Sequence, residues 1–340
     1  MALPGQQSLK SQVSRWENGH VVPESQYRRL LREVYGLDDR DLGFDDDGNT
    51  DQVLLGNELR TRLARAARLD ASTLTVLVAQ TDALRQLDRV QGAAYVLDQL
   101  RAHIDHLETL RHHSTTPDVR VSLSAALSDA SSLAGWQALD MGALGQSWHH
   151  FERAKDAGRE ASSTALGAFA LAEQAFVLLD LGELDSAAAQ LDYAIGHCKT
   201  SASLRLKSWL YATRAEMAAG AGDRDACKRY LDRATHELPD GLVDEETPYI
   251  LLDTEQLERW RGHCLAICGL PDAVAVLQQS LRTGGLSVRA EAGLRADLAA
   301  ALSISGEPDA LLSEVDAARK AAERAGSVRQ RRRLEALLTG

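Results

Sequence analysis

Apolar residues near the N-terminus recur at the spacing of one helix face. Leu9, Val13 and Trp16 follow one another at i, i+4 and i+7, which predicts a short helix over residues 8–16. Gly19 comes soon after and can take the left-handed backbone conformation that ends many helices.

A second apolar stripe follows Pro23 and consists of Tyr27, Leu30, Leu31 and Val34. Proline favours the first turn of a helix and Gly36 ends the stripe, so these two residues predict the bounds of a second helix. Residues 45–49 (DDDGN) are acidic and turn-prone. We therefore predict a domain over residues 1–44 and an acidic linker over residues 45–56.

The remainder of the chain contains a repeat. Gly142, Gly182 and Gly222 lie 40 residues apart, and each precedes a small or apolar residue, a large apolar residue and an alanine at constant spacing. These residues are Ser147, Ala187 and Cys227, then Phe151, Leu191 and Leu231, then Ala154, Ala194 and Ala234. Two copies offset by one residue start at Gly269 and Gly306.

This repeat is typical of tetratricopeptide (TPR) helix hairpins. The glycine ends the first helix, the small residue lets the second helix approach closely, and the alanine seats the next hairpin. Residues 58–69 and 74–112 predict further long helices, and residues 238–248 predict an insertion. We expect an all-α protein in which residues 57–340 form a TPR-like α-solenoid of antiparallel helix hairpins.

Composition agrees with helices and limits the partners. The 340 residues are rich in Ala, Leu and Arg and include only 7 Pro, which favours helical structure. The net charge is −11, so contact with nucleic acid needs a local basic patch.

The 4 Cys form no CxxC pair, which fits a reducing compartment. No apolar run reaches the ~18 residues of a membrane span, so we expect a cytoplasmic protein without membrane contact.

Residues 11–24 read SQVSRWENGHVVPE and resemble the recognition helix and following turn of a Cro/repressor-type helix-turn-helix, the XRE family. The resemblance implies that operator DNA is contacted at its base edges by Lys10, Ser11, Gln12 and Arg15, and at its phosphates by the loop with Asn18 and His20. Lys and Arg can donate to guanine, and Gln can pair with adenine. A homodimer is also implied, since one recognition helix reads only a few base pairs.

In that family two helices stand before the recognition helix, whereas only residues 1–10 precede it in this sequence. We therefore expect a partial helix-turn-helix. Two explanations remain open at this point. The start codon is placed too far downstream, or the DNA-binding domain has degenerated.

Three landmarks extend the resemblance along most of the chain. They are Ala134-Gly135-Trp136 followed by Asp140 and Gly142, residues 262–269 (GHCLAICG) and residues 326–334 (GSVRQRRRL). Their order is similar to that in actinomycete XRE regulators with a C-terminal TPR-like sensor. This resemblance implies a transcriptional regulator whose repeats sense a ligand or a protein partner. The alternative is a TPR scaffold that mediates protein–protein interaction and binds no DNA.

The concave face of such a solenoid is lined mostly by the first helix of each hairpin. Counting back from the turn glycines places seven aromatic and acidic residues there, namely Trp136, Asp140, Phe169, Phe176, Asp180, Trp209 and Glu216. Rings interleaved with carboxylates suit an apolar ligand or peptide that carries a cationic group. In the alternative interpretation, the aromatic residues only form the core between helices.

Other chemistry has less support in the sequence. His263, Cys264 and Cys268 lie close together but lack a complete zinc-ligand spacing, so we expect no metal. The P-loop, the nucleophile elbow and the HExxH motif do not occur, so we predict neither enzymatic activity nor a cofactor. A basic cluster near the C-terminus consists of Arg329, Arg331, Arg332 and Arg333. We expect it to be a solvated helix end, with contact to DNA or an acidic partner as the alternative.

Overall fold

The computed structural model describes residues 6–17, 21, 23–39, 41–43, 47–198, 202–241 and 249–339, with side chains except at 6–9, 11, 17 and 47–55. Within these ranges the regular structure consists of sixteen helices, α1–α16, without a strand. The predicted all-α class is therefore confirmed. The chain divides into two compact units, residues 1–62 and residues 63–340.

The smaller unit holds α1 (Gln6–Glu17), α2 (Ser25–Tyr35) and most of α3 (Asp47–Ala66). The rings of Trp16 and Tyr27 lie 5.1 Å apart and join α1 to α2. Gly36 ends α2 with a φ of 65°. Leu30 is 46% exposed and Val34 is 75% exposed. The apolar stripe of α2 is therefore left largely uncovered by the described part of the chain.

The linker predicted over residues 45–56 is not a turn-prone segment where the structure describes it, because α3 begins at Asp47. An acidic residue at the start of a helix interacts favourably with the helix dipole and so stabilises the helix. Residues 52–55 (QVLL) also contain Gln and two Leu, which favour helices. Residues 45 and 46 lie outside the described ranges.

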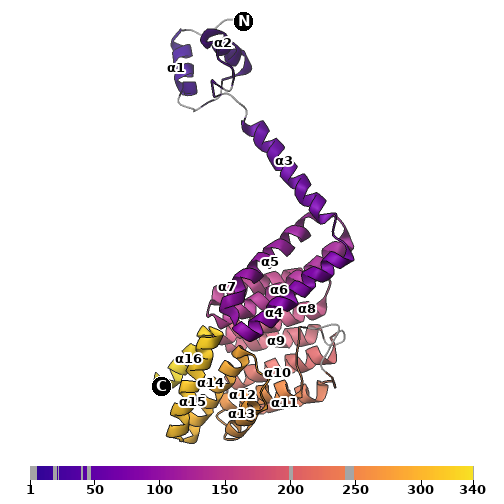
Figure 1. Cartoon of the computed structure of the whole chain (residues 1–340), viewed down its shortest axis with the longest axis vertical. Coiled ribbons are helices and arrows are strands. Elements are labelled where there is room, and N and C mark those ends of the chain that lie inside the picture. The colour runs from indigo at the N-terminus through magenta and orange to yellow at the C-terminus, as the bar shows by residue number, and fades with distance from the viewer. Residues whose placement is uncertain are drawn as a thin grey trace. The chain divides into compact units, whose positions relative to one another are not determined.

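The larger unit is formed by α4 (Ala71–Gln91), α5 (Ala93–His113), α6 (Pro117–Asp140), α7 (Leu144–Glu160), α8 (Thr164–Asp180), α9 (Leu184–His197), α10 (Leu204–Gly220), α11 (Arg224–Glu237), α12 (Thr254–Ile267), α13 (Asp272–Thr283), α14 (Val288–Ser305), α15 (Pro308–Ala325) and α16 (Val328–Thr339). Neighbouring helices pack in antiparallel pairs, most extensively α6 with α7, α10 with α11 and α14 with α15 (Figure 1). Residues 242–248 of the predicted insertion lie outside the described ranges.

The turn glycines of the repeat share one local geometry. Gly142, Gly182 and Gly222 have φ of 72°, 80° and 77°. The amide after each glycine donates to a carbonyl five residues earlier, over 2.9 Å, from Ala143 to Ala138, from Glu183 to Leu178 and from Asp223 to Ala218. This bond and the positive φ form a Schellman motif, which ends a helix. The nine repeat residues that follow the three glycines are all buried.

Short polar side chains cap the N-termini of five even-numbered helices of the larger unit. Asp70, Ser163, Ser203, Asp253 and Ser287 each accept a hydrogen bond from a backbone amide in the first turn of α4, α8, α10, α12 and α14. Such N-caps satisfy amides that have no partner within the helix, and each contributes about 1 kcal/mol.

Six even-numbered helices of the larger unit close into an inner ring. Each contacts the next in the order α4, α6, α8, α10, α12 and α14, and α14 contacts α4 again. α16 packs against both α14 and α6. The backbone of Ala325 lies where a Cβ atom on Gly92 would stand, so the end of α15 meets the turn between α4 and α5. No described helix is both long and apolar enough to cross a bilayer.

Candidate ligand-binding site

A cavity of about 460 Å³ lies inside the ring of even-numbered helices. The six ring helices, α4 to α14, and α16 all contribute lining residues, and so does the segment 249–252 before α12. The aromatic lining residues are Trp136, Phe169, Phe176, Trp209, Tyr249 and Trp260. The acidic lining residues are Asp88, Asp129, Asp140, Glu173, Glu216 and Asp297. Since small-molecule sites measure about 300–1,000 Å³, the cavity has the size of a ligand site.

Six of the seven residues predicted for the concave face line this cavity: Trp136, Asp140, Phe169, Phe176, Trp209 and Glu216. The seventh, Asp180, lies beside it and binds a lining arginine. The aromatic residues contribute to the core as well, because Phe169 and Phe176 are buried. Their rings contact Trp209 at 4.8 Å and Trp136 at 5.2 Å, respectively. The residues therefore line a cavity and also contribute to the core, and ligand binding by them stays a prediction.

The solvated helix end predicted for the C-terminal arginines is wrong for Arg329 and Arg333. Arg329 binds both carboxylate oxygens of Asp180, at 2.7 and 2.8 Å. Its guanidinium lies 5.9 Å from the Trp136 ring centroid and 6.0 Å from that of Phe176. Burial lowers the pKa of Arg329, but Asp180 outweighs burial and raises it. The prediction failed because it treated α16 as a free end, whereas α16 packs onto the inner ring.

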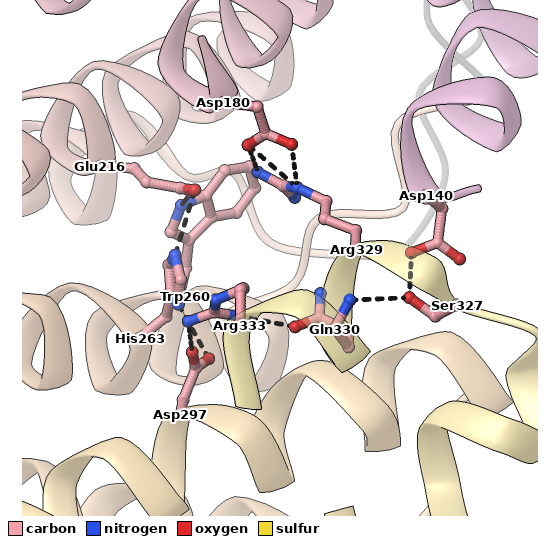
Figure 2. Close-up of polar contacts among 10 residues, drawn as sticks. All are labelled: Asp140, Asp180, Glu216, Trp260, His263, Asp297, Ser327, Arg329, Gln330 and Arg333. Atoms are coloured by element: carbon pink, nitrogen blue, oxygen red, sulfur yellow. Dashed lines mark hydrogen bonds and ion pairs between the residues drawn. The ribbon is translucent and has the colours of Figure 1, made fainter. Parts of the chain in front are cut away.

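His263 is the centre of a buried charge network that the sequence analysis did not identify (Figure 2). Its Nε2 lies 3.0 Å from Glu216 and its Nδ1 lies 2.8 Å from Asp297. Trp260 donates a second hydrogen bond to Glu216 at 2.8 Å, and Arg333 binds Asp297 at 2.5 Å. The network joins α10, α12, α14 and α16 along one wall of the cavity.

The carboxylates keep His263 protonated. Burial alone lowers the pKa of His263, but Asp297 and Glu216 outweigh burial and raise the pKa to about 10. Burial raises the pKa of both carboxyls, but His263 outweighs it and holds them below their usual range. Because an imidazolium has two N–H donors and no lone pair, His263 cannot serve as a metal ligand in this state.

A second polar seam joins α16 and α14 to the start of the ring. The Ser327 hydroxyl donates a hydrogen bond to Asp140 at 2.6 Å and accepts one from the backbone N–H of Gln330 at 3.2 Å (Figure 2). Arg289 forms an ion pair with Asp88 and approaches Asp140 at 3.6 Å. Residues about 190 positions apart in the chain thus meet at the cavity wall.

Glu173 is a further cavity residue that the sequence analysis missed. It lies on α8, four residues after Phe169 and three before Phe176, so helical periodicity places it on the same face. Extending the concave positions by one helical turn would have found it. His263 and Arg329 carried no such local signal, since their partners lie far away in sequence.

The residues proposed to contact DNA are described only in part. Lys10 and Arg15 are exposed on α1, and Gln12 is half-buried. Asn18, His20 and the side chain of Ser11 lie outside the described parts of the chain.

Within the described residues, no three His, Cys, Asp or Glu side chains are arranged to hold a metal ion. All four cysteines are buried and free. The chain matches no protein-family model and no curated protein.

Proposed function

We propose that this protein is a DNA-binding transcriptional regulator whose larger unit senses a ligand in the cavity inside the helical ring. The proposal rests chiefly on this cavity, because it has the size of a ligand site and is lined by six aromatic residues together with charged side chains of both signs. The regulator part of the proposal rests on the XRE resemblance of α1 and on its exposed cations.

The cavity supports a sensor role because it is built from every even-numbered helix of the larger unit, α4 to α16. A ligand there would contact helices from both ends of the larger unit at once. Binding would therefore stabilise the closed ring relative to any opened form, by an amount set by the ligand's preference for the closed state. TPR-like repeats fit this role, since their concave face is the usual binding surface.

The DNA-contacting part of the proposal assigns base contacts to Lys10, Gln12 and Arg15. Lys10 and Arg15 stand exposed on α1, where they can reach guanine acceptors or phosphates. We expect a cytoplasmic homodimer that reads two half-sites.

The test is binding of the full chain to DNA from upstream of its own gene, measured over a salt series. We expect specific binding that the double variant Lys10→Ala/Arg15→Ala loses. If both side chains contact phosphate, the slope of log affinity against log salt decreases by about 2. The matched control is Lys228→Ala/Lys320→Ala, which removes two exposed cations of the larger unit and should change nothing. If the affinity is the same for unrelated DNA sequences and is unchanged in both double variants, the assignment of Lys10 and Arg15 to DNA contact is contradicted.

The second candidate is a scaffold that binds a protein partner and no DNA. It is favoured by the exposed apolar side of α2, with Leu30, Val34 and Tyr35 each more than two-fifths exposed. Monomeric proteins rarely leave a contiguous apolar patch without a partner. Complete absence of DNA binding in the salt series would favour this candidate.

A further inference from the structure

Of the six acidic residues that line the cavity, Glu173 differs from the others in its contacts. Each of the other five forms an ion pair with an arginine or with His263. Glu173 has no hydrogen bond or ion pair within the described residues, and its Oε2 is buried without a partner. Glu173 as a whole is half-buried, but a buried carboxyl oxygen without a partner costs free energy and needs an explanation.

Aromatic residues lie beside Glu173 along α8 and at the cavity wall. Phe169 and Phe176 flank it on the same face of α8. Phe169 contacts Trp209 at 4.8 Å and Tyr249 at 4.6 Å, between ring centroids. Aromatic faces attract cations through their quadrupole, and this attraction is strongest where water is excluded.

The protein itself places a cation on the same group of rings. Arg329 lies over Trp136 and Phe176 and binds the carboxylate of Asp180. An aromatic pair with a carboxylate at its edge therefore already holds a guanidinium there. One and two helical turns before Phe176 on α8, Glu173 and Phe169 offer a carboxyl group and a ring, but the described residues supply no cation paired with Glu173.

We propose that Glu173 binds the ammonium group of a small arylalkylamine-type ligand, whose apolar body lies against Phe169, Trp209 and Tyr249. A cavity of about 460 Å³ fits a small molecule of this class. The inference rests on the ligand cavity of the proposed function and is independent of DNA binding.

The charges near Glu173 set how binding depends on pH. Burial raises the pKa of Glu173 well above its usual range; Asp129 of α6 adds to this, whereas Arg85 of α4 and Arg289 of α14 oppose it. Each of these neighbours is already paired, Arg85 with Asp129 and Arg289 with Asp88. An incoming ammonium group would favour the ionised carboxylate, so binding releases a proton from Glu173.

The experiment uses isothermal titration calorimetry of the full chain with tryptamine and with tryptophol, its neutral alcohol analogue. We expect tryptamine to bind about 10- to 100-fold more tightly, as a charge-assisted hydrogen bond allows. Titration in buffers of different ionisation enthalpy should show release of up to about one proton for tryptamine and none for tryptophol. The affinity for tryptamine should rise with pH as Glu173 ionises.

Two variants make the test specific. Glu173→Gln should bind tryptamine no better than tryptophol and should lose the proton release, while its melting temperature stays equal or rises because a buried ionisable group is removed. Glu335→Gln changes the same charge at an exposed position of α16 and should behave as wild type.

Three outcomes would overturn the inference. They are equal affinity for amine and alcohol, unchanged amine preference in Glu173→Gln, and no tryptamine binding at millimolar concentration. Glu173-dependent amine binding without DNA binding would leave this inference standing and reject the regulator. DNA binding without amine binding would reject this inference and leave DNA binding by the regulator standing.

Discussion

At the scale of single residues, the largely buried His263 makes the stability of the fold depend on pH. Its pKa of about 10 lies above the ordinary 6.5, so the folded protein holds this proton more tightly than the unfolded chain does. The stabilisation is complete below pH 6.5 and is lost as the pH rises towards 10. We expect the free energy of unfolding of the wild type to fall over this window, as measured by urea denaturation at a series of pH values.

His263→Gln should remove most of this pH dependence and should cost about 3–5 kcal/mol at neutral pH, because Glu216 and Asp297 lose a charged partner in a buried site. His149→Gln is the matched control, since His149 is an exposed histidine of α7. An undiminished pH slope in His263→Gln would show that other groups cause it.

At the scale of elements, contacts between turns and helix ends decide how the ring closes. Gly92 combines a φ of 86° with an Ala325 backbone that occupies the place of a Cβ atom. Its ψ of 171° puts Gly92 in an extended, positive-φ conformation that essentially only glycine adopts, so Gly92→Ala should cost about 1–3 kcal/mol of backbone strain and roughly 1–3 kcal/mol more for overpacking. Equilibrium denaturation would measure both together.

Gly182→Ala is the control that separates the two effects. Gly182 has a φ of 80°, but no atom lies within 4 Å of an added Cβ. We expect only the strain cost there. If both variants lose the same free energy of unfolding, the backbone near Gly92 and Ala325 relaxes to admit the added methyl group without an energetic cost.

On the scale of the whole molecule, the larger unit depends on ion pairs between helices that lie far apart in the chain. Arg329 on α16 binds Asp180 on α8, across 149 residues of chain. Arg329→Met should weaken α16 docking by about 2 kcal/mol, between the values for exposed and buried pairs. Hydrogen exchange of the α16 amides should then accelerate roughly 30-fold, if α16 opens as a local unit.

Arg331→Met serves as the control, because Arg331 is exposed on the same helix. It should leave hydrogen exchange unchanged. Faster exchange in both variants would mean that α16 depends on general charge and not on the Arg329–Asp180 pair.

Much of the larger unit could be predicted from local sequence. Apolar residues at a spacing of 3.6 define helices, and Gly142, Gly182 and Gly222 mark turns because glycine takes positive φ without strain. Six of the seven predicted concave residues line the cavity because helical periodicity alone fixes which residues share a face.

The sequence by itself therefore determined the helices, their turns and the face that points inward, since each depends on residues within a few turns of one another. Only the tertiary structure decided that the even-numbered helices close into a ring, that Arg329 meets Asp180, and that His263 lies between Glu216 and Asp297. These contacts depend on the small rotation between successive helix pairs, summed over the whole unit. No local pattern encodes that sum, and so no local pattern could have shown that Glu173 would be the lining carboxyl left without a partner among the described residues.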